Sequence, residues 1–334
     1  MRKIVSLMLA FALLLTCAFA EGRGTLEIVD EDIEGEDILE EEFGDGDAVV
    51  FDPDEELMLD SVVIESAFET LDNVKNILLL GMDSRGSDIS GRTDTMILLT
   101  VDVEKQTIKL TSFLRDTYVE IPGRKNNRLN AAYVFGGYDL LSQTLQRNFG
   151  VTPDAYVAIN LAGLVDVIDQ LGGVTVNVKS ERVDRVNAVI YWYNIQVLGM
   201  ENNPREGYLT KGGEQLLNGK QAEAWARYRH SESDFQRSAR QRELIMKIFE
   251  KICTMSVGEL ATFAAKNVSM VKTNMSITDI IALAPAVLAM RNAEIQEMQI
   301  PLSSAYKSQT ISGMSVLVPD RQKNVNALAK FLAQ

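Results

Sequence analysis

Short apolar runs alternate along this chain with segments of helical periodicity, and this alternation restricts its possible folds more than any other feature. Residues 76–81 (NILLLG) form a continuous apolar run closed by glycine, which is typical of a strand buried on both faces. Residues 95–103 (TMILLTVDV) and 107–113 (TIKLTSF) predict two more strands, joined as a hairpin by residues 104–106. Residues 154–160 (DAYVAIN) predict a fourth strand.

Helical patterns separate these strands. Residues 130–149 and 161–171 predict helices, which end at Gly150 and at Gly172-Gly173. Because strand and helix keep alternating, the expected fold class is α/β, with an open and mostly parallel sheet covered by helices on both faces.

The pattern changes after residue 174. A strand is predicted at 174–178, residues 180–209 read as an irregular excursion, and residues 215–226 return to a helix. A long helix is expected from 235 to 252, with Asp234 as its N-cap. Beyond it the chain predicts two helical patterns, two strands and a closing helix, in an extension that packs on the core or completes it.

Charge is distributed very unevenly. The formal net charge is -14, but residues 21–60 hold eighteen Asp or Glu against one Arg. The carboxylates of such an acidic segment repel one another, and the segment buries little apolar surface. Residues 21–72 are therefore predicted to be a disordered tether. Residues 61–334 are then close to neutral, and their clustered arginines are expected to lack local carboxylate partners. Nothing in the sequence resembles a nucleic-acid binder, which would carry a basic excess across a whole face.

The first twenty residues resemble an export signal. Two basic residues precede an apolar run of seventeen, and Ala18-Phe19-Ala20 stands before Glu21 as a cleavage site. The same run is long enough to remain in the bilayer as an anchor. Residues 1–20 are therefore a signal peptide or a membrane anchor, and the protein is expected outside the cytoplasm.

Cysteine and histidine exclude several kinds of site. Cys17 lies in the signal and Cys253 in an apolar helical pattern, so no disulfide is expected in the mature chain. His230 is the only histidine, which argues against zinc sites built from Cys and His. It also stands among arginines, which argues against a Ser-His-Asp triad.

The loop over residues 81–96 follows one predicted strand and leads into the next. It carries Asp83, Arg85, Arg92 and Asp94 on a Gly/Ser-rich frame. Ligands of open α/β sheets bind outside the carboxyl ends of the strands. The two carboxylates could share one Mg²⁺, which takes one or two protein carboxylates together with phosphate and water. An ordinary loop with surface ion pairs is the alternative.

Two further polar groups are expected at the same edge. Arg115-Asp116 follows the strand at 107–113, and neighbouring parallel strands deliver their carboxyl ends together. Arg128 and Asn130 directly precede a helix, whose N-terminus is itself an anion site.

Residues 226–242 contain five arginines in seventeen positions. In an extended segment Arg227 and Arg229 would point to one face, while Arg237 and Gln241 lie four apart on a helix and project together. A solvated helix face is the alternative interpretation. Guanidinium groups gathered without carboxylates favour a polyanion, whose phosphate oxygens arginine binds in pairs, and a pyrophosphate with Mg²⁺ is the simplest such ligand.

Taken in order, six motifs resemble those of the LytR-CpsA-Psr family of cell-wall phosphotransferases: GMDSR with GRTDT, SFLRD, RLNAAY, GGV, LLNGKQAEAWARYR and SDFQRSARQ. The resemblance covers residues 73–255, the predicted catalytic domain, and leaves 256–334 as the extension. It implies a three-layer α-β-α sandwich with a central mixed sheet and a hydrophobic pocket for a lipid tail.

The resemblance also implies a function on a Gram-positive envelope. Such an enzyme takes a polyprenyl-pyrophosphate-linked glycan as donor and joins its phosphosugar to peptidoglycan at the membrane surface, attaching teichoic acid or capsule. It implies Mg²⁺, or Mn²⁺ in its place, on Asp83 and Asp94. The family's pyrophosphate-binding arginines correspond to Arg92, Arg115, Arg227, Arg229 and Arg237.

The predicted site combines both lines of reasoning. The expected catalytic residues are Asp83, Asp94, Arg92 and Arg115. The expected pyrophosphate ligands are Arg85, Arg92, Arg115, Arg128, Arg227, Arg229, Arg237 and Gln241. Asn130 and Asp234, the family's acid at that helix start, are expected to support them. Two alternatives stay open: a pyrophosphatase that lets water attack, and a non-catalytic envelope protein that binds prenyl phosphates.

Overall fold

The computed structural model describes most of the chain after the acidic segment: residues 74–82, 91–102, 104–228, 234–276, 280 and 288–333. Several predictions lie outside the described residues: the export signal, the tether, and the placement of Asp83, Arg85, Arg229 and His230.

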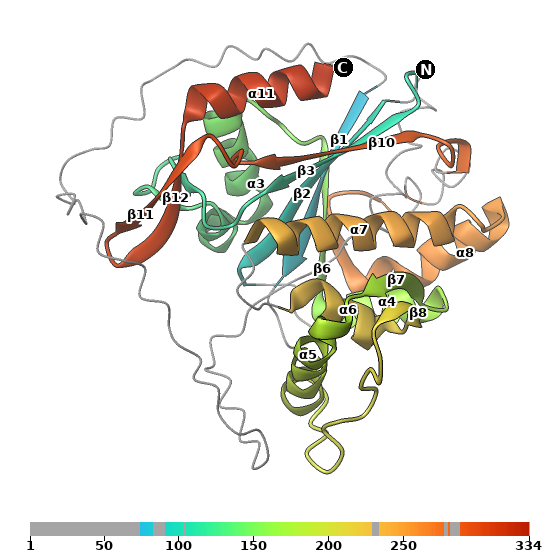
Figure 1. Ribbon diagram of the computed structural model, residues 1–334. Coiled ribbons are helices and arrows are strands. Elements are labelled where there is room, and N and C mark those ends of the chain that lie inside the picture. The colour runs from blue at the N-terminus through green and yellow to red at the C-terminus, as the bar shows by residue number, and fades with distance from the viewer. Residues whose placement is uncertain are drawn as a thin grey trace.

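A six-stranded sheet forms the centre of the described part (Figure 1). Its strand order is β10-β3-β2-β1-β6-β9. The strands are β1 (Val74–Met82), β2 (Thr93–Asp102), β3 (Thr107–Phe113), β6 (Ala155–Asn160), β9 (Val271–Thr273) and β10 (Glu294–Ile300).

The sheet is mixed, as the family resemblance implied, and not mostly parallel. Two pairs run parallel, β10 with β3 and β1 with β6, whereas β1–β2, β2–β3 and β6–β9 are antiparallel. The expected hairpin between β2 and β3 is confirmed. Its connection is too short for a parallel crossover, which needs a dozen residues or more.

Strand direction brings one edge of the sheet together. Because β2 runs against β1 and β3, its amino end lies beside their carboxyl ends. The carboxyl ends of β6 and β10 reach the same edge, since each is parallel to a neighbour. The segments that follow β1, β3 and β6 and the segment that precedes β2 therefore meet.

Helices cover both faces of the sheet (Figure 1). One face packs an apolar cluster with α3 (Asn130–Phe149) and α11 (Arg321–Ala333). The larger cluster on the other face holds the remaining helices: α4 (Leu161–Gln170), α5 (Val183–Gln196), α6 (Gly219–Arg227), α7 (Asp234–Ile252) and α8 (Val257–Asn267). Successive residues of β1 serve opposite faces, with Ile77 and Leu79 in the larger cluster and Leu78 and Leu80 in the smaller.

Residues 180–209 are not the irregular excursion that was expected. They contain a 3₁₀ turn (Ser180–Arg182) and then α5. Val186, Ile190 and Tyr193 are buried at helical spacing, a signal that surrounding charged and aromatic residues conceal. The following loop is fixed by Asn194, whose side-chain amide donates to the carbonyl oxygens of Pro204 and Glu206 at 2.7 and 3.0 Å.

The predicted helix at 215–226 begins later than expected. Residues 215–217 belong to β8 (Gly213–Leu217), which pairs with β7 (Val174–Val178) in a two-stranded sheet apart from the central one. Helix α6 starts at Gly219, where Asn218 and Gln221 form a capping box. The local cap therefore sets the start of the helix.

The C-terminal part contributes to the central structure. β10 is the strand beside β3, and the hairpin of β11 (Tyr306–Ile311) and β12 (Met314–Pro319) lies next to the short strand β4 (Tyr118–Val119). β4 itself pairs with β5 (Asn127–Arg128). Within the described ranges, no helix combines the length and apolarity needed to cross a membrane.

Candidate functional site

The turn that carries Arg115 and Asp116 follows β3 and is held from two sides. The backbone N–H of Asn130, the first residue of α3, donates to the Arg115 carbonyl at 3.2 Å. The N–H of Leu317 on β12 donates to the Asp116 carbonyl at 2.9 Å. Asn130 thus supports the turn through its backbone, and the C-terminal hairpin supports it from the other side.

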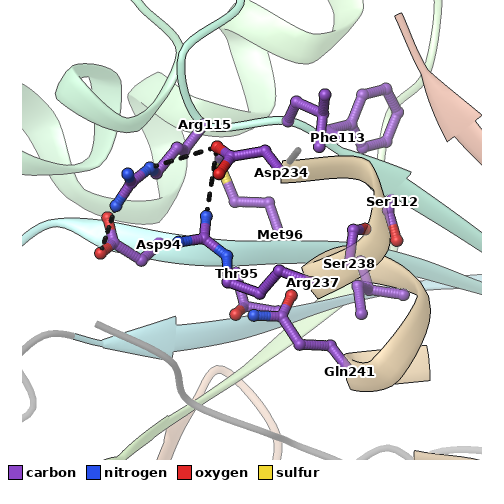
Figure 2. A pocket seen from close by; sticks show the side chains of 12 residues that line it. Asp94, Thr95, Met96, Ser112, Phe113, Arg115, Asp234, Arg237, Ser238 and Gln241 are labelled. Carbon is purple, nitrogen blue, oxygen red and sulfur yellow. Dashed lines mark hydrogen bonds and ion pairs between the residues drawn. The ribbon is translucent and has the colours of Figure 1, made fainter. Parts of the chain in front are cut away.

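Arg115 is the centre of an ion-pair network (Figure 2). Its Nη1 lies 2.8 Å from Asp94 Oδ2, and its Nε lies 3.4 Å from Asp116 Oδ2 and 3.8 Å from Asp234 Oδ2. Asp234, at the start of α7, also contacts Arg237 Nη2 at 3.3 Å. The network therefore joins the beginning of β2, the end of β3 and the first turn of α7.

Arg128 extends this network outward. Its Nε lies 3.3 Å from Asp116 Oδ1, and its Nη2 donates to the Ser315 carbonyl at 2.7 Å. Asp116 thus holds Arg115 and Arg128 together.

A small cavity of about 10 Å³ lies between β2, β3 and the start of α7. Its polar lining comes from Asp94, Thr95, Ser112, Arg115, Asp234, Arg237, Ser238 and Gln241. Arg237 and Gln241 both face it, which confirms that the two project together from α7.

The buried polar groups of this cavity that have no hydrogen-bond partner among the described residues include Gln241 Nε2 and Thr95 Oγ1. Gln241 is 3% exposed, and Figure 2 shows it beside Thr95. Leaving such a donor unsatisfied costs about 1–3 kcal/mol. An anion in the cavity would accept from it, so the donor set fits phosphate oxygens.

Arg242 anchors α7 to the sheet. Its Nη1 donates to Ser112 Oγ on β3 at 2.8 Å and to Ser238 Oγ at 3.1 Å, and its Nε pairs with Glu297 on β10. Sequence analysis missed the two serines. The alternation of β3 gives the signal for Ser112, because Ile108 and Leu110 of the same strand face the α7 side.

Arg227 lies in a different environment from the one predicted. It is the last residue of α6 and not part of an extended segment. Its Nη1 contacts Glu223 Oε1 at 2.8 Å, and its guanidinium lies 4.5 Å from the centre of the Trp192 ring. Glu223 is fully buried; burial raises the pKa of its carboxyl, and Arg227 acts against this rise. Arg227 does not line the cavity beside Arg115.

The expectation of arginines without local carboxylate partners is therefore wrong. Among the described residues of 226–242, Arg227, Arg237 and Arg242 form ion pairs, and Arg240 donates to the Tyr228 carbonyl at 2.6 Å. The pairs are Arg227–Glu223, Arg237–Asp234 and Arg242–Glu297. Glu223 lies one helical turn before Arg227, Asp234 starts α7, and Glu297 lies on β10. The count of charges within residues 226–242 includes neither Glu223 nor Glu297.

The predicted metal ligands are only partly described. Asp94 is 7% exposed at the cavity and is held by Arg115, while Asp83 lies outside the described residues. Within the part of the chain that the structure describes, no three His, Cys, Asp or Glu side chains converge as a metal cluster. A buried carboxylate beside an anion cavity fits Mg²⁺, which takes one or two carboxylates and completes its shell with phosphate and water. Arg92 is exposed directly before β2.

The sequence model of the LytR_cpsA_psr family matches residues 53–331. The chain belongs to this family. The match to LytR-CpsA-Psr proteins extends beyond the motifs at 73–255 and takes in the β10–α11 region.

Curated relatives carry two kinds of name. One, from Bacillus cereus, is the polyisoprenyl-teichoic acid--peptidoglycan teichoic acid transferase TagU, 33% identical over 208 residues, or 60% of each chain. Another, the regulatory protein MsrR of Staphylococcus aureus, is 28% identical over 262 residues, 77% of this chain and 74% of the relative. The chain thus spans about 60% of the length of the first of these LytR-CpsA-Psr relatives.

Solved structures share the fold. The structure of TagT bound to LIIa-WTA superposes with a TM-score of 0.61 at 27% identity, covering 79% of this chain and 91% of TagT. The Bacillus subtilis TagT crystal structure gives a TM-score of 0.60 with the same coverage. The mixed sheet flanked by helices is therefore the LytR-CpsA-Psr architecture.

Proposed function

We propose that this chain is an extracytoplasmic phosphotransferase that moves a phosphosugar glycopolymer from a polyprenyl-pyrophosphate carrier to peptidoglycan. The observation that carries the proposal is the buried network of Asp94, Arg115, Asp234 and Arg237 around a cavity with an unpartnered Gln241 amide donor. Family membership and the name of the TagU relative support the polymer and the acceptor.

The arginines bind and orient the pyrophosphate. Arg115 and Arg237 point their guanidinium groups at the cavity, where forked N–H donors match phosphate oxygens, and Gln241 adds a neutral donor. As the polyprenyl phosphate leaves, negative charge grows on its oxygens. Donors fixed before the reaction stabilise this charge, and loss of one such donor costs about 10²–10³ in rate.

The outer arginines serve the same ligand in this proposal. Arg128 is tied to Arg115 through Asp116, and Arg92 stands exposed two residues before Asp94. Arg85, Arg227 and Arg229 are assigned to the rim that meets the rest of the donor.

Asp94, together with Asp83, would hold Mg²⁺, or Mn²⁺ in its place. The metal, when bound, supplies positive charge that neutralises the pyrophosphate. Asp94 is already fixed by Arg115, so we assign Asp94 as the main metal ligand and Asp83 as the group that takes the proton from the acceptor hydroxyl. An apolar pocket for the prenyl tail and attachment at the membrane surface belong to the same proposal.

The test uses the full chain with a purified lipid-linked donor, with and without peptidoglycan acceptor. We expect a phosphodiester product only when the acceptor is present, and its loss with a chelator. Asp94→Asn should abolish transfer and lower the melting temperature, because Arg115 loses a buried partner; transfer is therefore measured well below the melting temperature of the variant. Asp139→Asn, an exposed carboxylate on α3, is the matched control.

Three outcomes would contradict the proposal or a part of it. Release of phosphosugar at the same rate without acceptor would indicate a pyrophosphatase. Tight donor binding with no turnover under any condition would indicate the non-catalytic binding protein. Full activity of Asp94→Asn in chelator would remove the metal from the mechanism.

A further inference from the structure

A second cavity, of about 610 Å³, lies in the helical layer between α4, α5 and α6. One face of α4 forms a wall of it, because residues 162, 165, 166 and 169 project to the same side. The end of α5, the loop after it and the start of α6 form the rest. The lining shares no residue with the cavity beside Arg115.

The walls of this groove are firmly set against one another. The N–H of Gly219 donates to Asp169 Oδ1 at 2.7 Å, which ties α6 to α4. A Cβ atom at Gly219 would lie 2.1 Å from the Val165 carbonyl oxygen, so the two backbones are in direct contact there. The groove is therefore already shaped before any ligand binds.

The groove is acidic. Asp166, Asp169 and Glu206 line it against one cation, Lys220. The Lys220 ammonium is already engaged, since it donates to Asn194 Oδ1 at 2.8 Å and lies 3.9 Å from Glu206 Oε1. Burial, and secondly the charge of Asp169, raise the pKa of the Asp166 carboxyl. Such a surface repels a phosphate-rich ligand.

Tyr193 forms the buried end of the groove. It is 2% exposed, and its hydroxyl makes no hydrogen bond to the residues that the structure describes. The pKa of this hydroxyl is raised first by burial and then by Glu223, Asp166 and Asp169, so the hydroxyl lies within reach of their charges. A hydroxyl in the wall of an acidic groove, with no hydrogen bond to the described residues, points to a ligand that exchanges hydrogen bonds with it.

We propose that this groove binds the acceptor glycan strand of peptidoglycan, an inference that rests on the transferase function proposed above. Sugar hydroxyls donate to the Asp166 carboxylate and exchange hydrogen bonds with Tyr193. Val165 and Leu198, the latter 49% exposed, offer apolar contacts to sugar ring faces. The carboxylates form no metal cluster within the described residues, so a divalent cation does not account for the groove.

The groove also leads toward the donor side. The Tyr193 hydroxyl lies in the electrostatic range of Glu223 and Arg227, and Arg227 stacks on Trp192, the neighbour of Tyr193. An acceptor strand in the groove thus lies against α5 and α6, the helices that carry Trp192 and Arg227, an arginine assigned to the donor. The negative walls of the groove repel the polyanionic donor, so donor and acceptor bind to different surfaces of the protein.

Tryptophan fluorescence can test this directly, since the two tryptophans of the chain, Trp192 and Trp225, stand on α5 and α6. The probe is the β-1,4-linked tetramer of N-acetylglucosamine, which carries neither peptide nor phosphate. We expect saturable binding to the full chain, weakened about fivefold in Tyr193→Phe and about tenfold in Asp166→Asn, in keeping with the loss of one hydrogen bond. Asp139→Asn should bind as wild type does.

Transfer kinetics separate this inference from the proposed function. In both groove variants the KM for the acceptor should rise, with the KM for the donor and the affinity for pyrophosphate unchanged. Unchanged tetramer binding and acceptor KM in both variants would overturn the groove assignment, as would a failure of wild type to bind the tetramer. If wild type transfers nothing but binds the tetramer through Tyr193 and Asp166, the transferase function fails and the glycan site stands.

Discussion

Replacing Arg227 with methionine tests whether the ion pair of Arg227 with Glu223 stabilises the fold or whether repulsion from neighbouring arginines destabilises it. The change keeps the apolar stem that packs near Trp192 but removes the charge opposite Glu223. Glu223 is 0% exposed, and its Oε2 has no hydrogen-bond partner in the described part of the chain. Arg227→Met therefore leaves a buried carboxylate without its cation.

The expected cost is large. Breaking a buried ion pair by removing one member typically costs about 3–5 kcal/mol, because the remaining charge is uncompensated. At about 2–4 °C per kcal/mol for a domain of this size, the melting temperature should fall by roughly 6–20 °C. If the arginines were unpaired and repelled one another, Arg227→Met would instead raise the stability of the fold. If Arg227 were an ordinary surface residue, the change in stability would be less than about 0.5 kcal/mol.

The loss should also depend on pH. Burial raises the pKa of Glu223 above its ordinary value of 4.5, and removal of Arg227 raises the pKa further, because the arginine acts against the shift. The folded variant then holds a proton that the unfolded chain releases, so its stability falls as pH rises from about 4.5 through the folded pKa. The defect should be greatest at neutral pH and shrink toward pH 4.5.

Thermal and denaturant unfolding of wild type, Arg227→Met and the double variant Arg227→Met/Glu223→Gln across this pH range would measure both effects. The double variant should recover much of the lost stability and lose the pH dependence. A neutral-pH stability within about 0.5 kcal/mol of wild type, or a defect of equal size at pH 4.5 and pH 7, would refute the reasoning.

Two other changes have clear expectations. Gln241→Met should leave the empty protein as stable as wild type or slightly more so, because it removes a buried unsatisfied donor. It should also weaken the pyrophosphate-dependent rise in melting temperature, which for wild type corresponds to about 2.7 kcal/mol at a hundredfold excess over Kd. Deleting residues 21–60 should leave the transfer rate unchanged, since so acidic a segment packs against little; loss of folding would refute the tether.

Local signals made much of the fold predictable. The helical segment at 130–149 has the predicted bounds, although Gly136 and Gly137 leave the helical conformation and kink it. It ends where expected because Gly150 adopts a φ of 74°, the left-handed conformation that glycine favours. Sequence patterns predicted five of the six strands of the central sheet and missed β9. They did not predict strand directions, because a strand buried on both faces has the same pattern in either orientation. Only the three-residue connection at 104–106 determined one pairing in advance.

The sequence predicted which residues line the site but not which of them form ion pairs. Asp94, Arg115, Arg237 and Gln241 were expected at one sheet edge, and the structure brings them together there. Their carboxylate partners depend on contacts distant in sequence: Arg115 meets Asp94 across 21 positions, and Arg242 meets Glu297 across 55. Charge counted along one stretch cannot reveal such pairs, since they form only when the strands and α7 are assembled.

These pairs explain how a nearly neutral domain can gather its arginines. Arg115 makes contacts with three carboxylates, and Asp234 joins it to Arg237. A guanidinium has five N–H donors, so an arginine can remain bound to a carboxylate and still offer donors to a phosphate. The repulsion between the cations is then balanced when the chain folds and not when the substrate binds. Because the donors are already fixed, little conformational freedom is lost on binding, and the site can act mainly on the charge that develops during transfer.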